Sequence, residues 1–190
     1  CGTVAKLASK KGMKVTLYTS DKDYLQLIDE NISVSLLKRG LSDMDLVAVE
    51  NMIEKFGFSP LQIIDYKALR GDASDNLPGI PGVGEVRAVE LIKEYGTFEK
   101  IVEAAKNLKG KLYEKIIEGA DQGRFCYQLA TIKTDVELPF SLDDLVYQGY
   151  DRNEVNEFAK KYELKQFPTR LPVTKKMGEK ESFKGEYNEI

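Results

Sequence analysis

The sequence predicts an α/β fold: a parallel sheet flanked by helices, followed by an α-helical subdomain. Two short segments rich in β-branched and aromatic residues, 14–20 and 32–37, alternate with helical stretches near the start of the chain. Strands that alternate with helices are typical of a parallel sheet covered on both faces. After Gly57 the pattern changes to short helices separated by turns rich in glycine and proline.

The first part, residues 1–57, opens with apolar residues at helical spacing from Gly2 to Lys11. A turn follows the strand over 14–20, and residues 24–28 predict a short helix. A longer helix is expected over 45–56, with Val49, Met52, Ile53 and Phe56 on one face, and Gly57 suits its C-terminal cap. Because the chain opens directly into a helix and not on methionine, we expect it to begin inside a larger gene product.

The second part, residues 58–170, starts with a helix-capping pattern at Ser59, Pro60 and Gln62. That helix is expected to end at Gly71, and after a turn-rich segment the next helix should cover 85–95. The remaining elements expected are helices near 98–106, 111–119, 123–130 and 152–163, and a strand over 132–138. Residues 171–190 are polar and without periodicity, as in a linker or tail.

Composition excludes several kinds of chemistry. The chain has no histidine, which rules out histidine acid–base catalysis, Ser-His or Cys-His nucleophile pairs and histidine-bound zinc. Its net charge is −3, so any contact with nucleic acid must come from a local patch. Two cysteines without zinc-binding spacing, and no apolar run long enough to cross a membrane, predict a reduced, cytoplasmic protein. Carboxylates, backbone amides, lysines and metal ions are left to carry any catalysis.

Two pairs of aspartates are the first candidate site. Asp21 and Asp23 follow the first strand, where ligands collect in parallel α/β sheets. Asp72 and Asp75 are three residues apart, so one helical turn would put both carboxylates on the same face. Four carboxylates brought together repel one another unless a hard cation such as Mg²⁺ or Mn²⁺ neutralises them. The alternative, that these residues are helix caps and solvated surface, remains open on spacing alone.

The second candidate is the glycine-rich connection over 78–84, between two predicted helices. Backbone amides around Gly79, Gly82, Val83 and Gly84 can approach a DNA phosphate closely, and the next helix adds its N-terminal dipole. Arg87, one turn into that helix, can add a positive charge. An ordinary tight turn between helices would use the same residues for steric reasons.

Three segments carry a family resemblance: 19–27, 67–85 and 129–136. Together they resemble the 5′ nuclease family, and most of all the 5′-3′ exonuclease domains of bacterial DNA polymerase I, relatives of the flap endonucleases. The resemblance implies hydrolysis of DNA phosphodiesters near a 5′ end or 5′ flap with two divalent ions. It implies that Asp21, Asp23, Asp72 and Asp75 are metal ligands and that Lys22 lies near phosphate or solvent.

The resemblance also implies partners and a location. Residues 79–84 match a helix-hairpin-helix element that grips duplex DNA and often holds K⁺ through main-chain carbonyls. Polymerase domains in the same parent chain and a bacterial, nucleoid-associated location are expected. Two features depart from the family. Glu85-Val86-Arg87-Ala88 replaces Glu-Lys-Thr-Ala, which moves the basic residue about 100° around the helix. The family's first strand and first acidic cluster precede the part that this chain matches, so the resemblance implies that residues 1–57 are the C-terminal part of the nuclease core and that this fragment by itself lacks part of the metal site. A duplex-binding module without catalysis, or an unrelated α/β regulatory domain, are therefore the competing hypotheses.

Overall fold

The computed structural model describes residues 1–39 and 43–172, which fall into two units, residues 1–139 and residues 140–190. The first unit contains α1 (Gly2–Lys10), β1 (Val15–Thr19), the 3₁₀ helix η1 (Lys22–Leu27), β2 (Ile32–Arg39), β3 (Asp43–Val47), α2 (Val49–Phe56), α3 (Gln62–Arg70), α4 (Glu85–Tyr95), α5 (Phe98–Ala105), α6 (Lys111–Glu118) and α7 (Ala120–Ala130). The second contains η2 (Asp143–Leu145), α8 (Arg152–Lys161) and α9 (Phe167–Arg170). None of the helices in these described ranges is long and apolar enough to span a bilayer.

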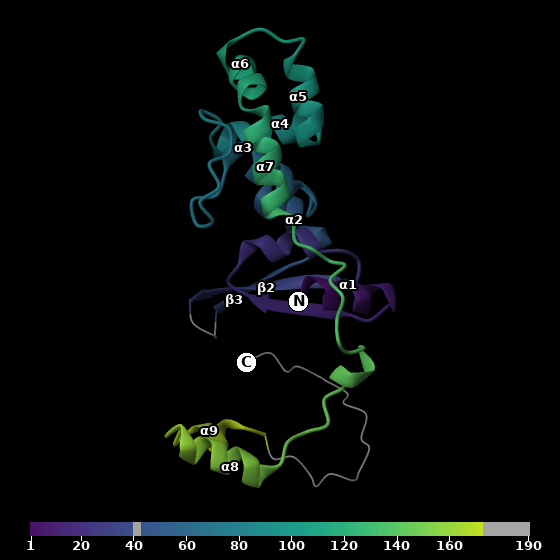
Figure 1. Cartoon of the computed structure of the whole chain (residues 1–190), viewed down its shortest axis with the longest axis vertical. Helices are drawn as coiled ribbons and strands as arrows, with labels where there is room; N and C mark the ends of the chain where they lie inside the picture. The colour runs from purple at the N-terminus through teal and green to yellow at the C-terminus, as the bar shows by residue number, and fades with distance from the viewer. Residues whose placement is uncertain (40–42, 173–190) are drawn as a thin grey trace. The chain divides into compact units, whose positions relative to one another are not determined.

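The three-stranded sheet has the order β1-β2-β3 and is mixed (Figure 1). Strands β1 and β2 are parallel, with Val15 opposite Ile32, whereas β2 and β3 are antiparallel, with Val34 opposite Val47. Val34 and Val47 are fully buried, so their shared face of the sheet is the core face. The predicted parallel pairing is confirmed for β1 and β2 and is wrong for β3.

Strand β3 replaces the first turn of the helix predicted over 45–56. Residues 43–47 pair with β2, and the helix α2 begins only at Val49. Hydrogen bonding to a neighbouring strand outweighed the helical spacing of the apolar residues, a tertiary effect that local patterns do not contain. Of the predicted apolar face, Met52 is buried, but Val49 and Ile53 are 45% and 63% exposed.

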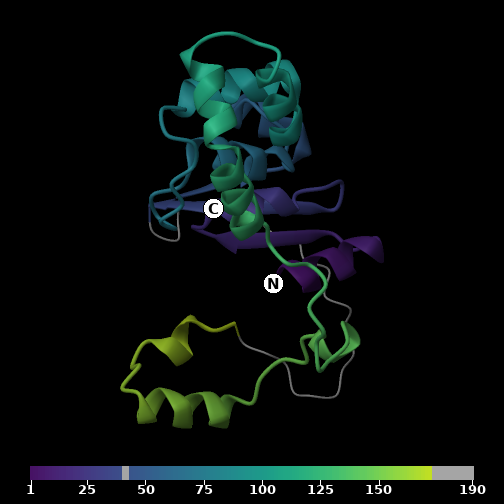
Figure 2. The same ribbon diagram turned by 45° about the horizontal axis from the view of Figure 1, so that its top comes forward.

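The helices α3 to α7 gather on one side of the sheet (Figures 1 and 2). Helix α3 is central, since it contacts α4, α5, α7 and η1. Phe98 and Leu69 are among the fully buried side chains of this layer. Helix α4 has the predicted bounds and ends at Gly96, where φ is +91°.

The segment 132–138, predicted as a strand, has no regular secondary structure and pairs with none of the described strands. Side chains from the first residues of the chain hold it in place. The Ile132 amide donates to Gln26 Oε1 (2.8 Å), and the Val136 amide donates to Thr3 Oγ1 (3.2 Å). The backbone of this segment, despite its β-rich composition, is therefore bonded to side chains and not to another strand.

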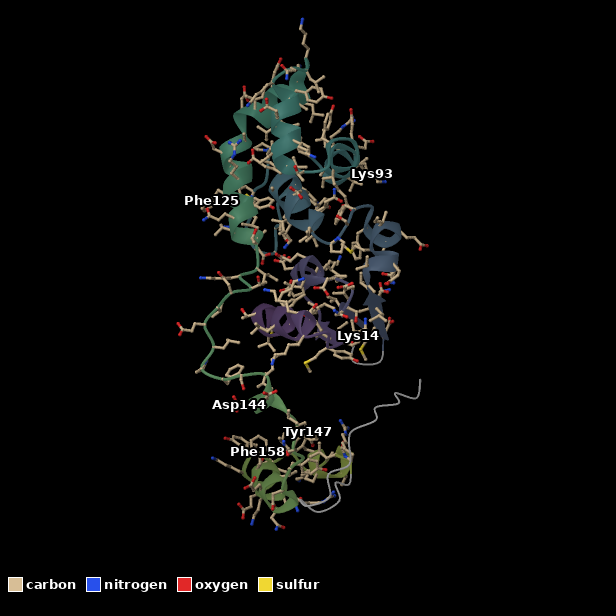
Figure 3. The ribbon with its side chains drawn as sticks, turned by 90° about the vertical axis from the view of Figure 1, so that its right-hand side faces the viewer. Lys14, Lys93, Phe125, Asp144, Tyr147 and Phe158 are labelled. Atoms are coloured by element: carbon tan, nitrogen blue, oxygen red, sulfur yellow. The ribbon has the colours of Figure 1, made fainter. Side chains whose placement is uncertain are left out.

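The second unit has its own small aromatic cluster. The Asp151 side chain caps α8 by accepting from the Asn153 and Glu154 amides. Phe158 on α8 (labelled in Figure 3) packs against Tyr162 and Phe167 at ring distances of 4.7 and 6.3 Å. The division at 57/58 and at 170/171 stays a prediction, and most of the predicted tail, 173–190, lies outside the described residues.

Candidate metal centre

Three aspartates from two separate segments converge on one point. Asp23 lies in η1, and Asp72 and Asp75 lie in the turn that follows α3. One carboxylate oxygen from each lies within 4.8 Å of the others. Asp23 and Asp72 are partly buried, while Asp75 is more exposed. Such a set of oxygen atoms is suited to a hard divalent cation.

The backbone after β1 orients Asp23. Asp21 is the N-cap of η1: its amide donates to Thr19 Oγ1 (3.0 Å), and its Oδ1 accepts from the Asp23 amide (2.8 Å). The Asp21 carboxylate is exposed and is not one of the three that converge. The structure therefore brings together three of the four predicted aspartates and gives the fourth a capping contact.

The turn after α3 orients Asp72 and Asp75. Asp72 and Leu77 exchange two backbone hydrogen bonds of 2.8 Å, which close the turn. Asp72 Oδ1 also accepts from the Ser74 amide (2.9 Å) and hydroxyl (2.5 Å). The prediction that a helical turn would put the two carboxylates on one face is wrong, because a closed hydrogen-bonded turn does so instead.

Two glycines at the base of this turn touch each other. Gly71 and Gly79 have φ values of +79° and +61°, which favour glycine. A Cβ atom on Gly79 would lie 2.2 Å from the Gly71 nitrogen, and one on Gly71 would lie 2.4 Å from the Leu77 carbonyl oxygen. The two backbone segments approach this closely only because neither carries a side chain.

Lys67 on α3 lies at the centre of the three carboxylates. Its ammonium pairs with Asp23, with Asp72 (2.6 Å) and with Asp75 (3.2 Å), and its side chain is only 7% exposed. No role was predicted for this residue. The available signal was a lysine within the apolar stripe of α3, between the buried Ile63 and Ala68.

The ion pairs shift the pKa values in the cluster. Burial raises the pKa of Asp23 despite its contact with Lys67. Burial also disfavours the charged form of Asp72, but hydrogen bonds from Lys67 and Ser74 outweigh it and lower that pKa to about 2. For Lys67, burial is likewise outweighed by Asp23 and Asp72, which raise its pKa. The cluster thus sets three carboxylates against one ammonium.

A cleft of about 250 Å³ borders this cluster. Lys67 and Asp72 belong both to the cluster and to the lining of the cleft. Phe56 and Tyr66 are among the aromatic residues that line it. The cations along its lining are Lys22, Lys55, Lys67 and Arg70, against Asp72 and Glu85. The cleft therefore has a net positive lining next to an acidic centre.

The predicted hairpin residues divide into packed and open positions. Gly79 is packed against Gly71, and its carbonyl accepts from Gln122. The Val83 amide already donates to the Ile80 carbonyl (3.0 Å).

The later hairpin residues are nearer to solvent. A Cβ atom on Gly82 would lie 2.5 Å from Lys115 Nζ, so the Lys115 side chain covers this glycine. Gly84, the N-cap of α4, has no atom within 4 Å of its Cβ position. Arg87 is exposed and pairs with Glu90 (2.7 Å). Of the predicted hairpin residues, Gly84 and Arg87 are thus the ones most open to solvent.

The sequence and the fold match a known class of protein. Residues 58–153 match the family described as "5'-3' exonuclease, C-terminal SAM fold". That match covers half of the chain, which therefore belongs to the 5′-3′ exonuclease family.

The curated relatives are polymerases. The chain is 43% identical to DNA polymerase I of Bacillus subtilis (strain 168) over 155 residues, which cover 81% of this chain and 18% of that protein. It is 37% identical to DNA polymerase I of Streptococcus pneumoniae (serotype 4) over 174 residues, or 91% of this chain and 20% of that one. The chain thus spans about a fifth of the length of these relatives.

Two solved structures have a similar fold. One is described as "Divalent metal ions (zinc) bound to T5 5'-exonuclease" and has a TM-score of 0.60 and 23% identity, covering 68% of this chain and 47% of that one. The other, the catalytic core of Rad2 in complex with DNA substrate, has a TM-score of 0.55 and 17% identity, covering 88% and 60%. At these identities the likeness concerns the fold.

Proposed function

We propose that the chain is part of a structure-specific 5′ nuclease that hydrolyses DNA phosphodiesters at a 5′ end or 5′ flap with divalent metal ions. The observation that carries the proposal is the convergence of Asp23, Asp72 and Asp75 in a chain of the 5′-3′ exonuclease family. The T5 5′-exonuclease of similar fold binds divalent metal ions, and the Rad2 catalytic core was solved with DNA substrate. Because the curated relatives are DNA polymerase I, we propose polymerase domains in the same parent protein and a bacterial cytoplasmic, DNA-associated location.

In this proposal the acidic residues of the chain bind the metal ion, and basic residues of the adjoining cleft bind phosphate. Asp23, Asp72 and Asp75 fit a divalent ion because their oxygen atoms converge and carry an excess of negative charge over Lys67. Asp21 is not one of the three converging carboxylates, but its negative charge acts on Asp23 and would add to the attraction for a cation. Mg²⁺ or Mn²⁺ bound there would supply an activated water and positive charge for the leaving oxygen.

The cleft beside the centre would hold the nucleic acid. Lys22 and Arg70 line it and offer positive charge for the phosphates on either side of the cut. The turn held by Gly71 and Gly79 keeps Asp72 and Asp75 fixed relative to that cleft. Fixed ligands and positioned phosphates are what phosphodiester hydrolysis needs from a protein without histidine.

A cleavage assay on a 5′-flap duplex tests this proposal. The parent protein that contains this chain should cut the labelled flap strand with Mg²⁺ or Mn²⁺ and not after chelation. The double variant Asp72→Asn/Asp75→Asn should lose at least about a hundredfold in rate, as expected when metal-dependent charge stabilisation is removed. The matched control Asp135→Asn/Glu137→Gln removes two exposed charges elsewhere and should cut at the normal rate. Equal cleavage by both double variants would contradict the ligand roles.

A second candidate function is duplex binding without hydrolysis. The open backbone at Gly84 and the exposed Arg87 favour it, because the first amides of α4 have no partner within the helix. Arg87→Gln should weaken duplex binding for every sequence and reduce the salt slope by about one. The control Arg124→Gln, on α7, should leave both unchanged. Salt-dependent binding by a chain whose parent protein never cuts would establish this function in place of the first.

The same binding assay tests the proposed K⁺ at the hairpin. If main-chain carbonyls between Gly79 and Gly84 hold K⁺ against the duplex, exchanging KCl for LiCl at equal ionic strength should weaken binding severalfold. Equal binding in the two salts would exclude a specific K⁺ contribution, since non-specific counterion release depends on ionic strength.

A further inference from the structure

Lys67 occupies the point at which the three carboxylates converge. Its ammonium contacts one oxygen of Asp23, of Asp72 and of Asp75, and the Asp72 and Asp75 distances are 2.6 and 3.2 Å. These aspartates also form the group whose oxygens lie within 4.8 Å of one another. A cation held by the protein and a cation taken from solution would therefore use the same oxygen atoms.

Charge and burial make this contact strong. The Lys67 side chain is 7% exposed, and few lysines are buried to this degree without such partners. Two cations at contact distance repel one another strongly where water is largely excluded. A divalent ion bound to Asp23 and Asp72 thus requires the ammonium to move.

We propose that Lys67 is a tethered cation that competes with divalent metal ions for Asp23, Asp72 and Asp75 and thereby sets the metal affinity of the centre. This inference rests on the metal site of the proposed function. In the metal-free protein Lys67 keeps the three carboxylates together. When metal binds, its flexible side chain moves into the adjoining cleft, which Lys67 already lines and which has a volume of about 250 Å³.

Displacement has a consequence for substrate binding. The cleft lining also includes Glu85 and Tyr66, whose polar atoms can accept a hydrogen bond from the displaced ammonium. Its positive charge then joins those of Lys22 and Arg70. Metal binding therefore raises the positive charge of the cleft in which phosphate is expected, so metal and phosphate should bind cooperatively.

Calorimetric titration with Mn²⁺ tests the competition directly. Lys67→Met removes the competing charge, so the 190-residue chain should bind Mn²⁺ at least about tenfold more tightly than the wild type. Lys67→Arg keeps the charge and should not bind more tightly. Lys55→Met is the matched control, because Lys55 lines the same cleft but pairs with Asp45 outside the cluster. Unchanged or weaker binding by Lys67→Met would overturn the inference.

Chemical labelling of Lys67 in the wild-type chain tests the same inference without relying on a variant that folds correctly. Lys67 should react slowly with an amine-acylating reagent in the metal-free protein, because its ammonium is buried and paired. Saturation with Mn²⁺ should accelerate labelling at Lys67 severalfold, as read by peptide mass spectrometry, and leave Lys55 unchanged. Equal labelling of Lys67 with and without Mn²⁺ would show that metal does not displace it and would overturn the inference.

The outcomes separate this inference from the proposed function. Tighter Mn²⁺ binding by Lys67→Met, in a chain whose parent protein cuts no flap substrate, would support the competition and refute the nuclease proposal. If cleavage depends on metal but Lys67→Met binds Mn²⁺ no more tightly than the wild type, the nuclease proposal is supported and the competition is refuted.

Discussion

The contact between Gly71 and Gly79 allows a quantitative test of how the acidic turn is held. In Gly79→Ala the new Cβ would lie 2.2 Å from the Gly71 nitrogen and 2.4 Å from the Arg70 carbonyl carbon. Both neighbours are backbone atoms and cannot rotate away. The substitution must therefore separate the two strands of the turn that carries Asp72 and Asp75.

The expected cost has two parts. Alanine at a φ of +61° loses about 1–2 kcal/mol. Forcing a methyl group into a packed position adds about 1–3 kcal/mol, so the free energy of unfolding should fall by about 2–5 kcal/mol. Gly12→Ala is the matched control: Gly12 has a similar φ of +75°, but nothing lies within 4 Å of its Cβ position, so only the first part applies.

Thermal and urea unfolding of both variants measure the difference. Each kcal/mol should lower Tm by about 2–4 °C in a domain of this size. Gly79→Ala should also bind Mn²⁺ more weakly, because Asp72 and Asp75 move apart, whereas Gly12→Ala should not. If the two variants lose equal stability, the close approach of the glycines is not what holds the turn.

Two further results are expected. Gln26→Ala removes a bond donated to the Ala130 carbonyl (2.9 Å) and one accepted from the Ile132 amide (2.8 Å), so urea denaturation should show a loss of about 2–4 kcal/mol, and a loss below about 0.5 would contradict this role. Desolvation raises the pKa of Asp29, but hydrogen bonds from Lys6 and backbone amides outweigh it and lower that pKa below 3.8. Asp29 therefore stabilises the fold above about pH 4 and loses that contribution as pH falls further. The stability difference between wild type and Asp29→Asn should shrink between about pH 5 and pH 3; a constant difference would exclude this linkage.

Local patterns predicted the elements whose hydrogen bonds are local. Helix α4 has the predicted bounds because its apolar spacing and its terminal glycines all lie within its own sequence. Strand β3 and the segment 132–138 depend on distant partners: β3 on its pairing with β2, and 132–138 on Gln26 and Thr3. Local patterns therefore placed the start of a helix over the last residues of β3, and a strand at 132–138, which pairs with none of the described strands.

The candidate site was predicted by residue type more than by geometry. The spacing of aspartates and the family resemblance pointed to Asp23, Asp72 and Asp75, which converge, and to Asp21, which caps η1. The distance between Asp23 and Asp72 depends on how α3 packs against η1, and no sequence pattern contains it. Lys67 was missed for the same reason, because its partners come from two different segments.

The two halves of the acidic centre are about fifty residues apart in the chain, and α3 carries the lysine that joins them. A nascent chain that has completed only the sheet holds Asp23 without its partners. Assembly of the centre thus requires closure of a long loop and docking of a helix. The proposed metal site would therefore be complete only once α3 has docked against η1.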